Sequence, residues 1–335
     1  MFLIYKKIIF VQFTQLLKVL KNPTVMKKHI KLISIILTLI VSAILGFISI
    51  EVFKDYGWTI FLVIPFLIGF LPPFIVGKSK GITKRESYNL SFTTLGVTLI
   101  GLLIFAIEGL ICIAMALPIL GLLVWLGSYS AYKSNAGKWV NPTNTTIGIL
   151  LICISSMSFD YINEPENLIP VRTKIIVNTP IEVAWNNVVT FNKIEEPVDW
   201  VFKTGISYPT DATIKGTGVG AIRYCNFTTG SFVEPITTWN EPNLLQFDVK
   251  EQPIPMNEFN PFWNIHPQHL DGYFKSYKGQ FKLIKISENI TEIEGTTWYK
   301  VDITPVIYWK AWSDFIIHRI HKRVLSHIKI ESEKK

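Results

Sequence analysis

Charged residues are scarce in this chain. Asp, Glu, Lys and Arg make up 17% of its 335 residues, whereas hydrophobic residues make up 49%. A soluble globular protein carries about 25% charged residues, so this chain has too few to cover one water-facing surface. The shortage of charge excludes a single soluble enzyme domain, and the abundance of apolar residues excludes a disordered chain.

Cysteine is also scarce. Of three cysteines, Cys112 and Cys153 fall in long apolar runs, which leaves Cys225 alone in the C-terminal half. A disulfide within that half is therefore impossible, and a disulfide-stapled secreted mini-domain is excluded.

Sequence motifs for cofactor and metal chemistry are missing. The chain has no glycine-rich phosphate loop, no Gly-x-Ser-x-Gly elbow and no His-Glu-x-x-His zinc motif. His318 and His321 are three residues apart, but no third ligand stands at a suitable spacing, so we expect a histidine packed on a helix rather than a metal ligand. We predict no cofactor and no metal, and we assign no catalytic residue.

The positive charge is concentrated in the first half. Residues 1–159 contain 14 Lys and Arg against 4 Asp and Glu, whereas residues 160–335 contain 19 against 21. A nucleic-acid binder would place its basic residues on the folded, aromatic-rich part. Here they lie between apolar runs, which is typical of a membrane protein and excludes nucleic acid as a partner.

Three apolar runs are long enough for membrane helices. They are Leu32–Ile50, Trp58–Val76 and Leu90–Leu126. The third is about twice the length of one span and contains a single charge, Glu108, so we expect a helical hairpin that turns near Glu108–Gly109. The segment Thr145–Phe159 is short for a span. If it crosses the membrane, the chain has five transmembrane helices, and if it does not, the chain has four.

Loop charge predicts the orientation. Lysines and Arg85 cluster before Leu32, at Lys78–Arg85 and at Lys133–Lys138, which places the N-terminus and the second and fourth loops in the cytoplasm. With five helices the C-terminal domain lies on the outer face of the cell membrane, which we favour; with four it is cytoplasmic. Residues 1–27 form a basic segment that is either an interfacial helix or an over-extended start preceding Met26.

The C-terminal half has an α+β pattern. Val171–Val177 alternates as a strand, and Thr179–Glu182 forms the pattern of a capping box that opens a helix. Thr304-Pro305 opens a long final helix to about Ile330. The strand-like runs between these helices are Gly218–Phe227, Ser231–Trp239, Leu244–Val249, Gly279–Ile286 and Thr291–Val301. The order predicts helices packed on one face of a curved antiparallel sheet.

Three stretches of this half resemble a known superfamily. They are "VNTPIEVAWNNVVTF", "GTGVGAIRYCNFTTGSFVEPITTWNEPNLLQFDV" and "GTTWYKVDITPVIYWKAWSDFIIHRIHKRVLSHI". Their motifs and order resemble the START-like (SRPBCC) superfamily, and within it the polyketide cyclase/dehydrase and lipid-transport type, which in bacteria includes members with an N-terminal membrane region. The resemblance implies a helix-grip fold with a hydrophobic ligand cavity between the sheet and the C-terminal helix. It implies no common catalytic set, because fold does not determine function.

Arg223 is the most informative polar residue. It shares strand parity with Ala221 and Cys225, so it points into the apolar side of its strand, where Glu234 on the next strand falls within one residue of register. One interpretation is a buried pair that orients a polar group of the ligand; the other is an ordinary cross-strand ion pair on a solvated face.

Aromatic residues supply the remaining candidates. The run Pro253–Tyr277 is too long and too apolar for a plain connection, and we expect a lid over the cavity or a loop that dips into the membrane surface. The predicted ligand-binding residues are Arg223, Glu234, Trp239, Trp263, His266, Tyr273, Trp298 and Trp312.

The sequence thus predicts three parts and one leading function. The parts are the basic segment 1–27, a membrane region of four or five helices at 28–159, and a START-like helix-grip domain at 168–332. The leading hypothesis is a membrane-anchored module that binds a lipid or polyketide-like molecule, with membrane lipids as partners. The alternatives are a membrane-tethered cyclase/dehydratase-type enzyme and a non-catalytic interaction or sensory protein.

Overall fold

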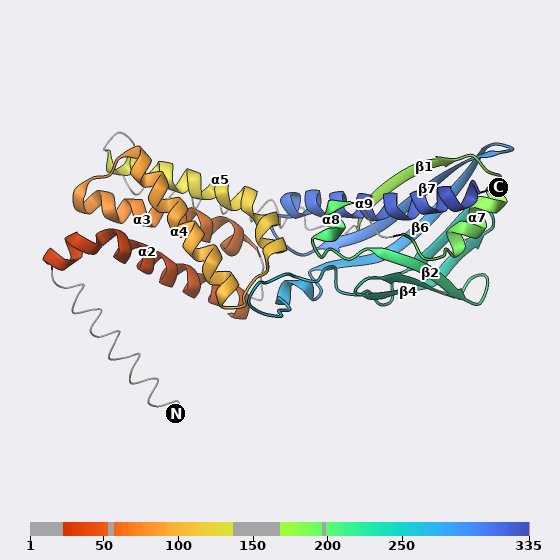
Figure 1. The fold of residues 1–335 in the computed structure, drawn as a ribbon, viewed down its shortest axis with the longest axis horizontal. Helices are drawn as coiled ribbons and strands as arrows, with labels where there is room; N and C mark the ends of the chain where they lie inside the picture. Colours follow the sequence, from red (N-terminus) through yellow and green to blue (C-terminus); the bar gives the residue numbers. More distant parts are fainter. Residues whose placement is uncertain (1–22, 53–56, 137–167, 196–198, 335) are drawn as a thin grey trace, which may run out of the picture. The chain divides into compact units, whose positions relative to one another are not determined.

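The chain forms two compact units in a computed structural model (Figure 1), which describes residues 23–52, 57–136, 168–195 and 199–334. The first unit combines the chain up to Leu102 with Ala116–Ser158, and the second combines Leu103–Met115 with Phe159–Lys335. The segment Leu103–Met115, here called the turn segment, therefore belongs to the C-terminal unit, although it includes the last residues of one apolar helix and the first residues of the next. The predicted segments 1–22 and Thr145–Phe159, and the boundary near residues 159–168, lie outside the described residues.

The first unit consists of apolar helices. They are α2 (Pro23–Phe47) with the π-helical continuation η1 (Ile48–Val52), η2 (Thr59–Val63) followed by α3 (Ile64–Lys80), α4 (Lys84–Ile104) and α5 (Leu110–Asn135). In the described part of the chain, four stretches are long and apolar enough to cross a membrane. The expected hairpin is confirmed, because α4 ends at Ile104 and α5 begins at Leu110 with Glu108 between them.

Small and hydroxyl-bearing residues let the helices of this unit approach closely. Ser91 Oγ donates to the Gly69 carbonyl at 2.7 Å, and Ser87 Oγ donates to the Ser128 carbonyl at 3.0 Å. A Cβ at Gly69 would lie 2.3 Å from the Val124 carbonyl oxygen, so only glycine fits there. Such contacts are how helices associate where lipid removes the hydrophobic driving force.

The second unit is built on one antiparallel sheet. Its strands are β1 (Ile169–Val177), β2 (Pro209–Lys215), β3 (Ile222–Phe227), β4 (Gly230–Asn240), β5 (Leu244–Asp248), β6 (Phe274–Ser287) and β7 (Ile290–Val301). Their order is β1-β7-β6-β5-β4-β3-β2, so β1 and β2 are the edges. The helices are α7 (Ile181–Val189), the short α8 (Trp200–Lys203) and α9 (Val306–Ser332), with a 3-10 turn, η3, at Gln268–Leu270.

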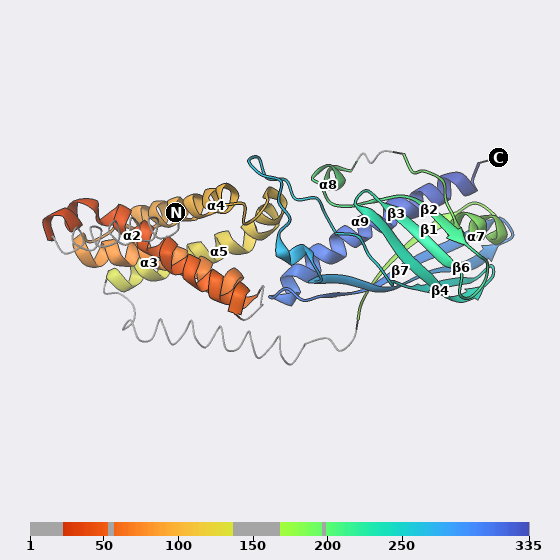
Figure 2. The same ribbon diagram turned by 90° about the horizontal axis from the view of Figure 1, so that it is seen from below.

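The sheet curls around α9. Thr173 on one edge strand contacts His318 of α9, and on the other edge Pro209 accepts a hydrogen bond from Arg323 Nε of the same helix at 2.9 Å. A flat sheet of seven strands is about 29 Å wide, far wider than one helix. Both edges reach α9 because the sheet is curved, and Figures 1 and 2 show α9 running along it. Register shifts within β4 and β6 mark bulges that bend these long strands.

The predicted fold class is confirmed, with two local corrections. The helix α7 begins at Ile181 with Pro180 at the cap, and no side chain caps it. The expected capping box is absent because Thr179 is buried and its carbonyl accepts from Thr291 Oγ1 at 2.9 Å. The strand β3 starts only at Ile222, because Gly218 and Gly220 adopt positive φ, and β2 was not predicted.

One apolar cluster fills the space between the sheet and the C-terminal part of α9. Trp185, with 2% of its surface exposed, meets Trp239 edge to face at 5.6 Å between ring centroids. The other buried members include Val177, Ile181, Val188, Phe191, Ile236, Leu245, Phe247, Leu283, Ile293, Val324, Leu325 and Ile328. The part of the chain predicted to enclose a hydrophobic cavity is therefore packed with apolar side chains.

Candidate functional site

Arg223 and Glu234 form a buried ion pair inside this cluster. They stand directly opposite each other on β3 and β4, and 1% of Arg223 and 5% of Glu234 are exposed. Arg223 Nη1 donates to Glu234 Oε2, and Nε donates to the Val189 carbonyl of α7 at 3.2 Å. Of the two interpretations of this pair, the structure agrees with burial and not with a solvated face.

Three aromatic rings enclose the Arg223 guanidinium. Its Cζ lies 5.6 Å from the ring centroid of Phe191, 5.4 Å from that of Phe247 and 5.6 Å from that of Phe281. Cation–π attraction offsets part of the cost of removing this charge from water. Nη2 is buried and has no hydrogen-bond partner among the described residues. An unsatisfied buried donor costs about 1–3 kcal/mol, so a guanidinium with one free nitrogen can still bind an acceptor oxygen.

Burial controls the protonation of the groups around this pair. It raises the pKa of the Glu234 carboxyl, and the charge of Arg223 offsets only part of that shift. Burial and the charge of Glu234 also raise the pKa of the Cys225 thiol to about 12. Cys225 is therefore a protonated thiol at neutral pH and not a nucleophile.

A polar layer crosses the interior where α9 passes β1 and β7. Thr173 Oγ1 lies 2.8 Å from His318 Nδ1 and 3.0 Å from His321 Nδ1, and Thr297 Oγ1 lies 2.8 Å from His321 Nε2. Burial, with a smaller contribution from His318, lowers the pKa of His321 to about 4. His321 is thus a neutral, hydrogen-bonded helix residue, in agreement with the expectation of a packed histidine.

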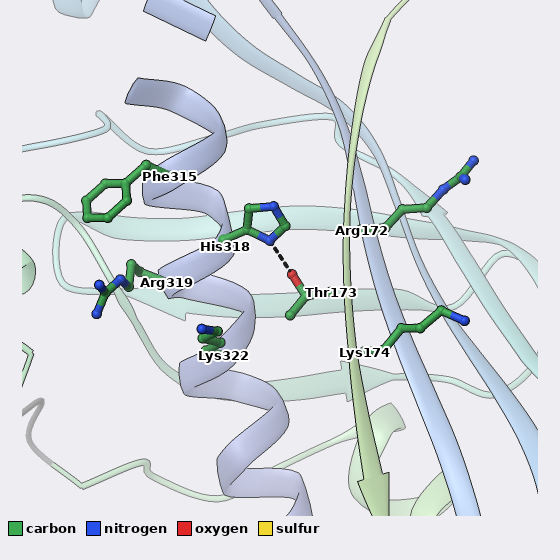
Figure 3. A pocket seen from close by; sticks show the side chains of 7 residues that line it. All are labelled: Arg172, Thr173, Lys174, Phe315, His318, Arg319 and Lys322. Atoms are coloured by element: carbon green, nitrogen blue, oxygen red, sulfur yellow. Dashed lines mark hydrogen bonds between the residues drawn. The ribbon is translucent and has the colours of Figure 1, made fainter. Parts of the chain in front are cut away.

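A pocket of about 480 Å³ opens between β1 and α9 beside this layer (Figure 3). Figure 3 shows Thr173 facing His318, whereas Arg172 and Lys174 project away from α9, as alternation along a strand requires. Four Arg and Lys residues line the pocket, and two of them form ion pairs. Arg319 contacts Asp199 at 2.6 Å, and Lys174 contacts Glu292 at 2.8 Å. The lining residues are Arg172, Thr173, Lys174, Phe315, His318, Arg319 and Lys322.

The turn segment and the long loop of residues 253–273 meet at several polar contacts. Leu110 N donates to the Phe259 carbonyl at 2.8 Å, and Trp263 Nε1 donates to the Ile104 carbonyl at 2.8 Å. Asn260 Nδ2 donates to the carbonyls of Leu103 and Glu108 at 2.9 and 3.2 Å. These contacts hold the loop on the turn between α4 and α5.

Exposed apolar side chains gather on both partners of this contact. Phe105 is 77% exposed, and Trp263 is 54% exposed although its indole N–H is bonded. We call this set the aromatic surface, and it consists of Ile104, Phe105, Ile107, Phe259, Phe262 and Trp263. Exposed apolar groups in such number are typical of a surface that contacts a membrane or another protein.

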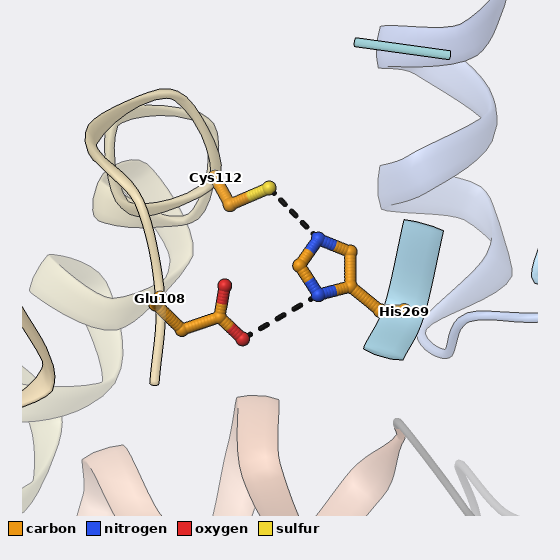
Figure 4. A group of neighbouring side chains, drawn as sticks. All are labelled: Glu108, Cys112 and His269. Atoms are coloured by element: carbon orange, nitrogen blue, oxygen red, sulfur yellow. Dashed lines mark hydrogen bonds and ion pairs between the residues drawn. The ribbon is translucent and has the colours of Figure 1, made fainter. Parts of the chain in front are cut away.

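Three potential ligands lie together beneath the same loop (Figure 4). Cys112 Sγ is 2.9 Å from His269 Nε2, and His269 Nδ1 is 3.5 Å from Glu108 Oε1. Although burial lowers the pKa of His269, the hydrogen bond and charge of Glu108 raise it more. No spacing in the sequence indicates this cluster, because His269 is 157 residues from Cys112. The only sequence signal was the lone Glu108 between two apolar runs.

The predicted ligand-binding residues do not all lie together. Arg223, Glu234 and Trp239 lie in or against the apolar cluster. Trp312 lies on α9 and meets Phe315 edge to face at 6.2 Å.

The remaining predicted residues lie elsewhere in the unit. Trp298 alternates with Thr297 and Tyr299, which face α9, so it lies on the opposite face of β7, across from Lys278. Trp263 belongs to the aromatic surface. His266 is exposed and contacts Asp271 at 2.9 Å, and Tyr273 accepts through its carbonyl from Asp302 N at 2.7 Å.

Comparisons with known proteins concern the fold. No protein-family model matches the chain, and no curated protein matches it. Among solved structures, a protein from Nitrosospira multiformis is 18% identical, with 50% of this chain and 97% of that chain covered and a TM-score of 0.32. Norcoclaurine synthase from Thalictrum flavum, in complex with dopamine and hydroxybenzaldehyde, is 14% identical, with 52% and 93% covered and a TM-score of 0.33. The Zhui aromatase/cyclase from a Streptomyces species is 9% identical, with 50% and 94% covered and a TM-score of 0.31.

Similarities at this level identify no common activity, and the assignment of the fold rests on the strand order and on the position of α9. The resemblance to the START-like (SRPBCC) superfamily is accordingly one of fold. The C-terminal unit has the helix-grip fold, joined in one chain to four apolar helices.

Proposed function

We propose that this chain is a membrane-anchored helix-grip module that binds a hydrophobic ligand, a lipid or polyketide-like molecule, between the sheet and α9. The observation that carries the proposal is the Arg223 guanidinium, which is buried among apolar side chains and whose Nη2 has no hydrogen-bond partner in the part of the chain that the structure describes. Small-molecule sites are mostly apolar and contain few, well-placed polar groups. Arg223 is such a group, and it favours a ligand with an acceptor oxygen, such as a carboxylate or a carbonyl.

Ligand entry requires the aromatic rings around Arg223 to move. Phe191, Phe247 and Phe281 each lie against the guanidinium, and the ring of Phe247 approaches Gly279 so closely that a Cβ there would lie 2.3 Å from it. Rotation of these rings exchanges their contacts with Arg223 for contacts with the apolar body of the ligand. The ligand oxygen then satisfies Nη2.

Membrane anchoring is supported by the apolar helices and by the aromatic surface. The turn segment joins α4 to α5, both long enough to span, so its exposed residues Phe105 and Ile107 stand where a helix leaves the hydrocarbon. Trp263, bonded to the Ile104 carbonyl, has an amphipathic ring of the kind enriched at membrane interfaces. We infer that the aromatic surface lies at the lipid boundary, from which a hydrophobic ligand is taken.

The experiment is native mass spectrometry of the full chain released from its own membrane in detergent, with R223K and K322A as variants. The wild type should carry a bound mass and R223K should carry less, because lysine keeps the charge but lacks Nη2. K322A should bind as the wild type does, because Lys322 lines the separate pocket between β1 and α9. A wild-type chain without any bound molecule, or equal occupancy in R223K, contradicts the proposal.

A photoreactive fatty acid gives a second readout. Cross-links should map to β3, β4 and the buried side of α9. Labelling confined to Phe259–Trp263 contradicts an interior site and leaves only contact with the lipid surface.

A further inference from the structure

The strongest unassigned feature is the cluster of Glu108, Cys112 and His269. Each residue offers one ligand atom, and these atoms lie within 4.8 Å of one another. Glu108 and Cys112 come from the turn segment and His269 from η3, so all three belong to the C-terminal unit. None of the three has a role in the proposed ligand site.

The geometry leaves one carboxylate oxygen directed into the cluster. Glu108 Oε1 faces His269 Nδ1 at 3.5 Å, whereas Oε2 is buried without a hydrogen-bond partner among the described residues. Figure 4 shows this second oxygen on the side of the Cys112 sulfur and the second imidazole nitrogen. An oxygen, a sulfur and a nitrogen therefore border the same small space.

Negative charge accumulates around this space. Glu258 Oε1 accepts from the Cys112 N–H at 2.9 Å, and Glu258 Oε2 accepts from the Ile111 N–H at 3.2 Å. Gly109 permits this approach, because a Cβ there would lie 2.0 Å from Glu258 Oε2. Two carboxylates and a thiol thus surround one imidazole in a half-buried site, an arrangement that a cation stabilises.

We propose that Glu108 Oε2, Cys112 Sγ and His269 Nε2 bind a divalent transition-metal ion of the zinc class. Thiolate, imidazole and carboxylate are the ligands that Zn²⁺ takes, and three protein ligands leave the fourth tetrahedral position to water. Ligand atoms around a tetrahedral zinc are about 3.5 Å apart, so sulfur and Nε2 must separate by roughly 0.6 Å from 2.9 Å. A side-chain rotation provides that movement. Binding converts the Cys112 thiol to a metal-bound thiolate and releases one proton to solvent.

The same contacts argue against a nucleophilic cysteine. A Cys–His–acid arrangement also activates a thiol, provided that donors stabilise the developing anion. Here the N–H groups of Ile111 and Cys112, which would serve as those donors, are already bonded to the Glu258 carboxylate. That second negative charge disfavours a free thiolate and favours a metal-bound one.

A bound metal would cross-link the loop of residues 253–273 to the start of α5. His269 lies in η3 and Cys112 in the first turn of the helix, so the ion cross-links two segments that are far apart in sequence. Such a cross-link supplements the hydrogen bonds of Asn260 and Trp263 to the turn segment.

The test uses the full chain in detergent, freed of metal by a chelator and titrated with Co²⁺ and Zn²⁺. The wild type should bind one ion and show a thiolate-to-cobalt charge-transfer band. C112S should lose the band, and H269Q and E108Q should bind at least 10-fold more weakly. H266N is the matched control, because His266 lies in the same loop but faces Asp271, and it should bind as the wild type does.

A measurement on the wild type alone guards against misfolded variants. Peptide-level mass spectrometry should show that Zn²⁺ slows alkylation of Cys112 and leaves that of Cys225 unchanged. Absence of stoichiometric metal, a charge-transfer band retained in C112S, or alkylation of Cys112 indifferent to Zn²⁺ overturns the proposal. None of these outcomes bears on ligand binding at Arg223, so the two proposals fail independently.

Discussion

At the scale of single residues, the chain places a charged pair where apolar side chains would be expected. Arg223 and Glu234 are held by each other, by the Val189 carbonyl and by three aromatic rings. A buried pair of this kind contributes little net stability compared with apolar residues, whereas loss of one partner leaves the other charge uncompensated. Net stability therefore gives little reason for a charged pair at this position, in agreement with the ligand-binding role proposed for Arg223.

This asymmetry gives a prediction for the pair. R223A should lower the stability of the full chain by about 3–5 kcal/mol, because Glu234 remains buried without its partner, which corresponds to a melting temperature lower by about 10 °C. The double variant R223M/E234M removes both charges and should recover most of that loss. Thermal unfolding in detergent, followed by tryptophan fluorescence, measures both. Equal destabilisation of the single and the double variant would show that the pair is not the origin of the effect.

At the scale of elements, histidines connect α9 to the sheet. His321 bonds Thr173 of β1 and Thr297 of β7 and stays neutral, because burial holds its pKa near 4. The turn segment is the second connecting element, since the loop of residues 253–273 is bonded to it. Both connections join segments that are distant in sequence.

The lowered pKa of His321 predicts a pH dependence. In the unfolded chain a histidine binds its proton near pH 6.5, whereas in the folded chain His321 does so only near 4. The unfolded state therefore takes up the proton first as the pH falls. The free energy of unfolding then decreases by up to about 1.4 kcal/mol per pH unit between the two pKa values.

The H321Q variant checks this dependence, because glutamine does not titrate. The difference in melting temperature between wild type and H321Q should shrink from pH 7 to pH 5. H266N, altered at an exposed histidine, should show no such trend. A pH-independent difference for H321Q would mean that His321 is not the titrating group.

At the scale of the whole molecule, the turn segment predicts on which side of the membrane the C-terminal unit lies. Loop charge predicts that the junction of α3 and α4, where Lys80 ends one helix and Lys84 begins the next, is cytoplasmic, and α4 would then carry residues 105–109 to the other side. Since the turn segment belongs to the C-terminal unit, we expect that unit on the outer face. This expectation agrees with five crossings rather than four.

Cysteine labelling of whole cells tests the sidedness. A membrane-impermeant maleimide should label K278C, at an exposed position of β6, in intact cells. K80C, at the end of α3 on the side predicted to be cytoplasmic, should react only after permeabilisation. The unaltered chain gives the background from its own cysteines. Labelling of K278C that also requires permeabilisation would place the C-terminal unit in the cytoplasm.

Features that depend on local periodicity and composition can be predicted from the residues alone. Apolar runs long enough to span predicted the membrane helices, and the single charge in the third run, Glu108, favoured a helical hairpin that turns there. Strand alternation placed Arg223 on the buried side, because parity along a strand is a local property, and a short hairpin brought Glu234 opposite it. Contacts between segments that are distant in sequence could not be predicted in this way. These contacts depend on how the sheet curls around α9 and on which loop covers the turn segment. They include the packing of Trp239 against Trp185, the position of Trp298 on the opposite face of β7 and the contact of Cys112 with His269. Such contacts are set by long-range packing, which no spacing within the sequence encodes.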